Sequence, residues 1–299
     1  MKKALKIIGL TLLAILLLLV VAFLLLRFVF LDEARSYCYG RLRTERIELL
    51  RAAAPREADT VRFRFLYRQD TARAREIRTY FRLDTLLRPS AATWDNALAL
   101  ARFVARSIPH ANQQIQPDKR NAIGLWEYSR TVEPAFNCRL HAILLHELLL
   151  ASGIVNRFVT CLPADPEDPD CHVVNLVWLP ERHKWAMLDS DMRAWLAGAD
   201  GTPLSLEEMR ERCIAGAPAE VRPLLPGERN DDYYQAYWAK NLYWFECWEE
   251  TGYDRETDCA GRCIELLPPG FAGFRLDASS VRTTDAERFW AAPDTESFR

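Results

Sequence analysis

The segment that most constrains the fold is NCRLHAILLHELLLASGI, residues 137–154. Its leucine, isoleucine and alanine side chains fall almost all the way round a helix, so we predict a helix that is buried on every side and ends near Gly153. Cys138 stands at the start of this helix. The positive end of the helix dipole and the unpaired backbone N–H groups there stabilise a thiolate. The segment therefore predicts both a core helix and a candidate nucleophile.

A cysteine nucleophile needs a base, and two strand-like segments downstream supply the residues for one. The first, CHVVNLVWL, carries His172, and the second, HKWAMLDSD, carries Asp189. This order predicts that Cys138 is the nucleophile, His172 the base and Asp189 the group that orients the imidazole. We expect the backbone N–H groups of Cys138 and the adjacent helix start to hold the oxyanion.

Hairpin geometry makes a prediction about the last two residues. A loop within LPER, with its turn centred between Pro180 and Glu181, would place His172 opposite Asp189 on one face of the hairpin. Asp191 lies on the same face and is the rival third member. A loop with an odd number of residues would put the two side chains on opposite faces and contradict the hypothesis.

The same residues give the chain a resemblance to a known family. The order of a cysteine helix, a Gly-Ile turn, an arginine near the next strand, a histidine strand and a Trp-x-x-x-Asp strand resembles the transglutaminase-like superfamily. The matching residues are Cys138, Gly153, Ile154, Arg157, His172, Trp185 and Asp189. The resemblance covers roughly residues 95 to 200, about a third of the chain. The family often continues from its aspartate into a Pro-Thr turn, where this chain reads DSDMRAW.

The resemblance implies an α+β, papain-like core in which the cysteine helix packs on an antiparallel sheet. It also implies acyl transfer, in which the thiolate attacks a carboxamide and the acyl-enzyme is released by water or an amine. The family spacing favours Asp189 over Asp191 as the third member. The predicted function is therefore a cysteine enzyme that acts on amide bonds of a peptide or protein substrate, either a peptidase or amidase or a protein-glutamine acyltransferase.

Two other classes of function remain open. A catalytically degenerate member would keep the fold and serve as a surface binding or interaction module, with Cys138 and His172 as ordinary core residues. A structural zinc site is conceivable because His141 and Cys138 share a helical face, but HELLL carries Leu150 where a zincin has its second histidine. The sequence has no phosphate-binding or dinucleotide-binding glycine motif, so we predict no cofactor and no metal.

The amino terminus carries an uncharged run from Ile7 to Leu26, which is long enough to span a bilayer. No small-residue cleavage site follows it, so we predict a retained, single-pass signal anchor over residues 1–31 with the bilayer as a partner. Lysines before the run and arginines after it favour opposite orientations. The formal net charge of −2 gives no reason to expect nucleic acid binding.

Cysteine spacing favours an extracytoplasmic location for the remaining chain. Cys161 and Cys171 flank the acidic loop CLPADPEDPDC, and Cys259 and Cys263 lie four residues apart. Both pairs are placed to close short disulfide loops, and disulfides persist in oxidising compartments. We therefore predict that the soluble part is exported.

The expected organisation has four parts: the anchor, a membrane-proximal segment over residues 32–92, a catalytic core over 93–215 and an aromatic-rich extension over 216–299. In the core we expect a helix from Thr93, with that residue as N-cap, and strands at about 156–162, 171–179 and 183–191. VRFRFLYR, before the core, alternates like a strand. In the extension, one helix is expected to carry an aromatic stripe that packs against the core. The stripe consists of Tyr234, Trp238, Trp244 or Phe245, and Trp248.

Overall fold

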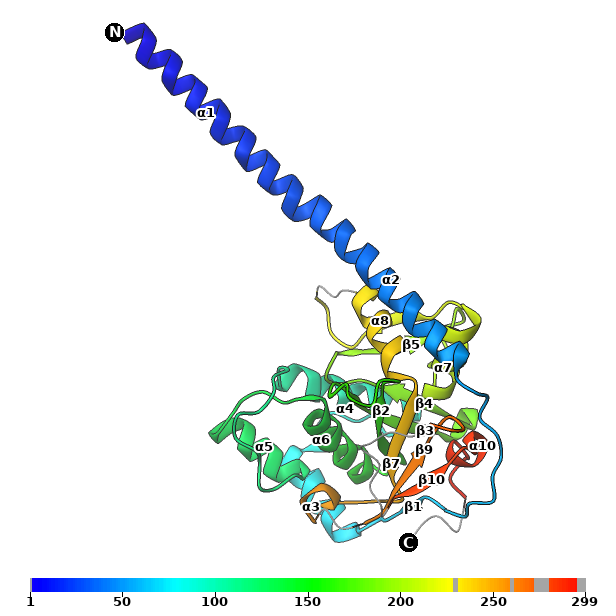
Figure 1. Cartoon of the computed structure of the whole chain (residues 1–299). Coiled ribbons are helices and arrows are strands. Elements are labelled where there is room, and N and C mark those ends of the chain that lie inside the picture. The colour runs from blue at the N-terminus through cyan, green and yellow to red at the C-terminus, as the bar shows by residue number, and fades with distance from the viewer. Residues whose placement is uncertain (1, 228–230, 259–260, 272–279, 295–299) are drawn as a thin grey trace.

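The computed structural model describes residues 2–227, 231–258, 261–271 and 280–294. They form a mixed α+β body joined to one long N-terminal helix (Figure 1). A six-stranded sheet lies at the centre, antiparallel except for its first two strands, which run parallel. In spatial order its strands are β10 (Val281–Thr283), β9 (Cys263–Leu266), β7 (Trp244–Trp248), β2 (Asn156–Leu162), β3 (His172–Leu179) and β4 (Lys184–Leu188).

Helices cover one face of this sheet. They are α3 (Thr71–Phe81), α4 (Thr93–Ser107), α5 (Ala122–Thr131) and α6 (Cys138–Ala151). Helix α6 is the innermost, because it packs on β2 and β3 and is covered by the other three. Every residue from Leu140 to Ala151 is buried, as the apolar sequence predicts. Gly153 follows with a φ of 75°, a left-handed conformation that ends the helix at little cost for glycine.

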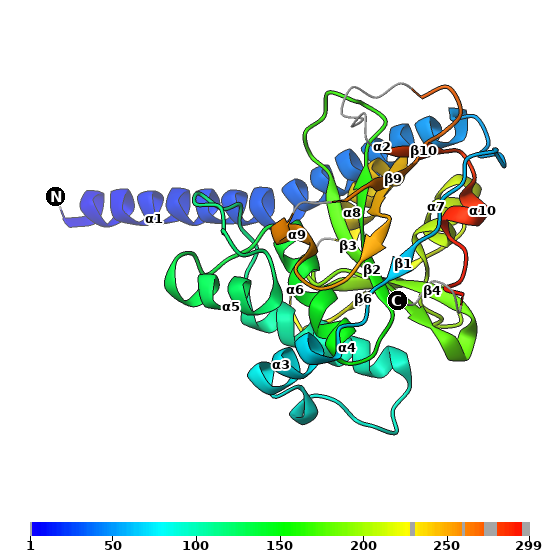
Figure 2. The same cartoon turned by 90° about the horizontal axis from the view of Figure 1, so that it is seen from below.

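The opposite face carries a second apolar core beneath smaller elements (Figure 2). These are α7 (Leu206–Ala215), α8 (Asp231–Asn241), α10 (Ala286–Phe289) and a ribbon of β5 (Ala194–Ala197) with β6 (Glu220–Pro223). A second ribbon pairs β1 (Leu66–Tyr67) with β8 (Glu250–Thr251), and the short turns are η2 (Leu83–Thr85), η3 (Pro180–Arg182) and α9 (Arg255–Asp258). Three strands of the central sheet and α8 thus come from the range predicted as a C-terminal extension.

The N-terminal rod is one continuous run of helix, made of α1 (Lys2–Leu25), a π-helical turn η1 (Leu26–Phe30) and α2 (Leu31–Ala52). It is long and apolar enough to cross a membrane, and the side chains from Ile7 to Leu26 are exposed along it. Beyond residue 31 the helix does not end but packs against α7 and α8. There the guanidinium of Arg46 donates to the carbonyl of Ala236 at 2.8 Å.

Two residues of the family-like pattern hold the sheet rather than line the site. Arg157 on β2 is fully buried among aromatic rings, with its guanidinium carbon 4.7 Å from the Trp185 ring centroid and 4.0 Å from that of Phe65. It donates to the Phe289 carbonyl at 2.8 Å. The cation–π contacts and this hydrogen bond offset part of the free-energy cost of burying the Arg157 charge. The hydrogen bond between Arg157 and Phe289 also joins β2 to the C-terminal segment.

Three local predictions differ from the structure, two of them in full and one in part. Thr93 is the first residue of α4 and not its cap, because its N–H and its hydroxyl both donate to the Glu181 carboxylate, at 2.9 and 2.6 Å. A side chain remote in sequence thus caps the helix. The segment VRFRFLYR forms ladder bonds only at β1, although Phe65 and Tyr67 point inward as its alternation predicts.

The third concerns the aromatic tract, which is not one helix. Helix α8 ends at Asn241, and the next aromatics, Trp244 to Trp248, form β7. That strand pairs with β2, so hydrogen bonding to the sheet takes precedence over the helical spacing. Tyr234 and Trp238 do lie on the helix and are buried against the core.

The predicted disulfide between Cys161 and Cys171 is also wrong. Cys161 is a buried free thiol, whose S–H donates to the Val159 carbonyl at 3.8 Å. Its partner across the ladder is His172, so Cys171, one residue earlier, faces the other side of the sheet. Cys263 is likewise a free thiol, and Cys259 lies outside the described residues. Among the described residues, the free thiols of Cys161 and Cys263 therefore give no support to the predicted export.

Candidate active site

Cys138 occupies the first position of α6, directly after the N-cap residue Asn137. The Asn137 side chain accepts from the Leu140 N–H at 3.1 Å. In the described part of the chain, this leaves the N–H groups of Cys138 and Arg139 without an acceptor, as expected for the first turn of a helix. Two backbone donors therefore lie beside the thiol, at the positive end of the helix dipole.

His172 begins β3, with its imidazole enclosed by protein. Its Nε2 atom lies 2.8 Å from Asp189 Oδ2, and the two side chains are only 2% and 0% exposed. The rings of Tyr237 and Trp238, on α8, meet the imidazole edge to face, with centroids 5.3 and 5.4 Å away. The ring is thereby held in one orientation by a carboxylate and two aromatic side chains.

The predicted register between the two strands is wrong by two residues. Leu179 pairs with Lys184, so the turn is centred between Glu181 and Arg182, and the extended ladder would place Asp191 opposite His172. The ladder stops at Leu188, however, and Asp189 instead forms a bridge with Ala194 that closes a tight turn. The loop still has an even length, which keeps Asp189 on the same face as His172 and diagonal to it.

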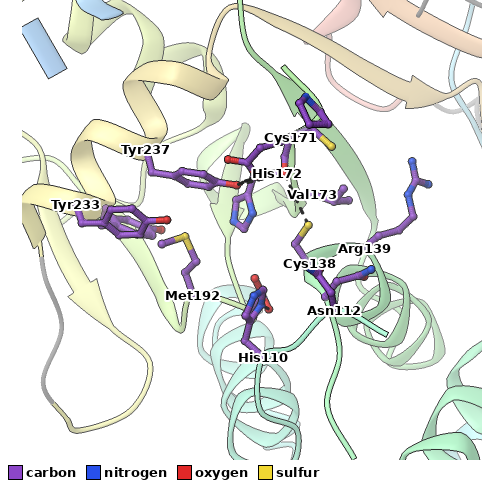
Figure 3. A pocket seen from close by; sticks show the side chains of 15 residues that line it. His110, Asn112, Cys138, Arg139, Cys171, His172, Val173, Met192, Tyr233 and Tyr237 are labelled. Carbon is purple, nitrogen blue, oxygen red and sulfur yellow. Dashed lines mark hydrogen bonds and ion pairs between the residues drawn. The ribbon is translucent and has the colours of Figure 1, made fainter. Parts of the chain in front are cut away.

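The Cys138 thiol and the His172 imidazole line the same pocket. Figure 3 shows Cys138 reaching from the start of α6 toward the backbone at the start of β3, where its sulfur is 4.0 Å from the Cys171 carbonyl oxygen. The thiol also lies close enough to His172 to raise the pKa of the imidazole. Because Nε2 is taken by Asp189, the nitrogen available to the thiol is Nδ1. The structure therefore brings Cys138, His172 and Asp189 into one contiguous set.

The electrostatics of this set favour a charged imidazole. Burial acts to lower the pKa of His172, but the Asp189 carboxylate and its hydrogen bond act to raise it, and so does Cys138. The attraction outweighs the burial, and the pKa of His172 is raised well above its ordinary value. At neutral pH this environment favours an imidazolium next to the sulfur, the state in which a thiolate is stabilised.

Cys138 and His172 open into a pocket of about 760 Å³. Its other walls come from the acidic loop at Pro169–Cys171, from tyrosines of α8, and from His110 and Asp191 (Figure 3). A pocket of this size is typical of sites for small molecules or short segments of chain. Among the described residues, no group of three or more His, Cys, Asp or Glu side chains is placed to hold a metal ion.

The wall formed by the acidic loop is fastened to α8. Lys240 Nζ contacts Asp168 Oδ2 at 3.0 Å and Asp170 Oδ2 at 2.7 Å, and the Tyr237 hydroxyl donates to Asp170 Oδ1 at 2.9 Å. Burial and the neighbouring Asp170 raise the pKa of Tyr237, so its hydroxyl stays protonated and keeps donating. The acidic loop between Cys161 and Cys171 is thus a fixed part of the pocket wall.

The positive side chain next to Cys138 is largely neutralised. Arg139 NH1 contacts Glu256 Oε1 at 2.8 Å, and that carboxylate is nearly buried. Figure 3 shows the Arg139 side chain pointing away from Cys138. The positive environment of the sulfur therefore comes chiefly from the helix start and from His172.

Sequence reasoning missed a second pair in this pocket. His110 Nδ1 lies 2.8 Å from Asp191 Oδ1, and the same oxygen lies 3.5 Å from Nε2 of the buried His141. The sequence predicted Asp191 only as a rival to Asp189 for His172. In the structure, the Asp191 carboxylate contacts His110 instead. His110 precedes the core helix in an irregular segment without periodicity, so no local pattern signals its position.

Comparison with known proteins gives little further information. No family model matches the sequence, and no curated protein matches it. Among solved structures, the chain is similar to a crystal structure of a candidate cysteine protease from Cytophaga hutchinsonii, with a TM-score of 0.32 and 14% identity. The similarity covers 50% of this chain and 48% of that chain, about half the length of either. So weak a likeness says nothing about activity, and the function is inferred from the side chains of the pocket.

Proposed function

We propose that the chain is a transglutaminase-like cysteine enzyme that breaks amide bonds through an acyl-enzyme. One observation carries the proposal: Cys138, at the start of a helix, lines the same pocket as a buried imidazole that its thiol influences, and Nε2 of that imidazole lies 2.8 Å from the buried Asp189. A nucleophile, a base and an orienting carboxylate gathered in one site are the minimum for covalent acyl transfer. Tyr237 and Trp238 supply packing that holds the base in place.

In the first half of the proposed reaction, the Cys138 thiolate attacks the carbonyl carbon of a carboxamide. The oxyanion that forms is held by the free N–H groups of Cys138 and Arg139. His172 gives its proton to the departing amine, the C–N bond breaks, and a thioester remains on Cys138. The Asp189 carboxylate keeps the imidazole in the orientation that this transfer needs. Water or a second amine then releases the acyl group.

The substrate class that fits is a peptide or protein, presented close to a membrane. The proposed anchor is the N-terminal helix, whose α2 segment carries Tyr39 against Tyr233 on the pocket wall, with ring centroids 5.4 Å apart. Tyr39 lies nine residues beyond Phe30, about 14 Å along a helix. The pocket rim would then lie near the bilayer surface, on whichever side the body faces.

The test is thiol reactivity in the full-length protein in detergent. Iodoacetamide labelling of each cysteine is followed by mass spectrometry against pH, with the exposed Cys38 as internal reference. We expect Cys138 to be labelled well below about pH 8.5, where unperturbed thiols become reactive. His172→Ala should abolish this early labelling, while labelling of Cys38 stays unchanged.

The opposite result would support the binding-module alternative. If Cys138 is labelled only after unfolding, in a wild type whose circular dichroism is that of a folded protein, the site is not an active thiol. The proposal would also be contradicted if His172→Ala left the pH dependence of Cys138 labelling unchanged, because the thiolate would then not depend on the imidazole.

A further inference from the structure

His110 faces the same pocket as Cys138 but belongs to a different part of the fold. Its side chain is 59% exposed, whereas its partner Asp191 is only 3% exposed. Figure 3 shows the rings of His110 and His172 both directed into the pocket beside Cys138. The pocket therefore contains one thiol and two imidazoles, each joined to a buried carboxylate.

The contact with Asp191 sets which nitrogen of His110 is free. An ionised carboxylate only accepts hydrogen bonds, so the proton of a neutral His110 lies on Nδ1, 2.8 Å from Asp191 Oδ1. The lone pair is then on Nε2, in a ring that lines the pocket and is 59% exposed. His141 does not compete for the negative charge, because burial lowers its pKa and keeps its ring neutral. His110 is thus held in the form that can accept a proton from a molecule in the pocket.

The backbone of His110 is fixed relative to the nucleophile. His110 forms a bridge with Phe136, two residues before Cys138. The Ala111 N–H donates to the Phe136 carbonyl, and the Phe136 N–H donates to the Pro109 carbonyl, both at 2.9 Å. The segment that carries His110 is therefore hydrogen-bonded to the segment that leads into α6. These bonds fix the position of the His110 backbone relative to that of Cys138.

We propose that His110, oriented by Asp191, is the general base for the molecule that receives the acyl group. This rests on the proposed function, because it needs a thioester on Cys138. It divides the chemistry: His172 serves the thiol and the departing amine during acylation, and His110 serves the acceptor, which is water, during release. The His172 side chain is 2% exposed, whereas that of His110 is 59% exposed to entering molecules.

The release step balances as follows. His110 Nε2 takes a proton from the water molecule as its oxygen bonds to the acyl carbon. The tetrahedral intermediate collapses, the C–S bond breaks, and the electron pair stays on Cys138 as a thiolate. His110 gives its proton to solvent, and His172, left neutral by the amine that departed in acylation, takes one back. The enzyme returns to its starting state with no net gain of protons.

The decisive variant is His110→Asn in the full-length protein in detergent. The asparagine amide can still donate to Asp191 from about the position of Nδ1, but it has no base in place of Nε2. The matched control is His183→Asn, an exposed histidine in the β3–β4 loop. The acyl donor is p-nitrophenyl acetate, followed by stopped-flow absorbance, which separates the acylation burst from the steady state.

We expect His110→Asn to keep the burst of wild type and to lower the steady-state rate about 100-fold, the lower end of what a general base contributes. Hydroxylamine attacks thioesters without a base, so it should restore most of the lost rate. Iodoacetamide labelling of Cys138 should not change, in contrast to His172→Ala. The control His183→Asn should match wild type throughout.

Other outcomes separate the two proposals. A wild type that shows neither a burst nor early labelling of Cys138 overturns the proposed function and this role together. A normal burst with an unchanged steady state in His110→Asn overturns the role of His110 alone. So does an equal fall in burst and steady state, or a fall that hydroxylamine does not rescue, because a purely structural defect would give either.

Discussion

The two histidine–aspartate pairs of the pocket have the same composition and the same 2.8 Å separation, yet their surroundings differ. In the first, His172 uses Nε2 toward Asp189 and both side chains are buried. In the second, His110 uses Nδ1 toward Asp191 and the ring is open to the pocket. The carboxylate fixes the tautomer in both, and burial sets how exposed the other nitrogen is: the His172 ring is enclosed beside the thiol, whereas the His110 ring is exposed to entering molecules.

Both carboxylates come from one short turn. Asp189 and Ala194 are joined by two backbone hydrogen bonds, at 3.1 and 3.0 Å, and Asp191 lies on the loop between them. Asp189 also accepts from the Met192 N–H at 2.9 Å through Oδ1, which leaves Oδ2 for His172. A turn of six residues therefore orients two imidazoles. Changes to either aspartate test whether the two pairs are independent.

The largest effect is expected from Asp189→Asn. The amide can donate to Nε2 of His172, which would move the ring proton to Nδ1 and stop the ring from accepting the thiol proton. By analogy with other triads, acyl transfer should fall by about 100- to 10,000-fold, measured as the burst rate with p-nitrophenyl acetate. Asp191→Asn is the matched control and should leave the burst unchanged. Equal losses in both variants would show that the pairs act as one unit.

A smaller effect is expected on stability as a function of pH. The pKa of His172 is raised in the folded state, so its contribution to the free energy of unfolding is full below its unfolded pKa of about 6.5. The contribution is lost as the pH rises through the raised folded value. Urea unfolding from about pH 6 to about pH 9 should show this decline in wild type and much less of it in Asp189→Asn.

His110→Asn is the comparison for that experiment. This variant leaves the His172–Asp189 pair intact, so it should keep the decline in stability that this pair produces. A slope that stays unchanged in Asp189→Asn but flattens in His110→Asn would reverse the assignment of the buried and the open pair.

The buried pair could be predicted from the sequence and the open pair could not, and the reason is physical. Cys138, His172 and Asp189 lie on or directly beside regular elements, where apolar periodicity fixes which residues face one another. His110 lies in an irregular strap whose position depends on hydrogen bonds to Phe136, a residue 26 positions later. Contacts of this kind leave no periodic trace in the sequence.

The register error follows the same rule. Hairpin arithmetic places partners correctly only while the ladder continues, and here it stops at Leu188. The predicted even length of the loop is confirmed, and it keeps Asp189 on the same face as His172. The predicted residue opposite His172 is wrong. Likewise the aromatic tract predicted a helix throughout, whereas β7 forms because the edge of β2 was open to pair with it.

The smallest effect is expected from Tyr234→Phe, which probes how completely the buried pair is enclosed. The Tyr234 hydroxyl donates to Asp189 Oδ2 at 3.4 Å, a long contact to an oxygen that His172 already holds at 2.8 Å. Its loss removes one weak donor without leaving the carboxylate unpaired, so the free energy of unfolding should fall by only about 0.5–1.5 kcal/mol. Urea denaturation measures it, with Tyr37→Phe on the exposed face of α2 as control.

Two opposing effects of Tyr234→Phe act on the burst rate: the carboxylate loses a donor, which strengthens its attraction for His172, while the ring loses some rigidity. We therefore expect little change in the burst. A loss as large as that of Asp189→Asn would mean that the phenol, and not the carboxylate alone, sets the state of His172, which would make the buried site a set of four residues rather than three.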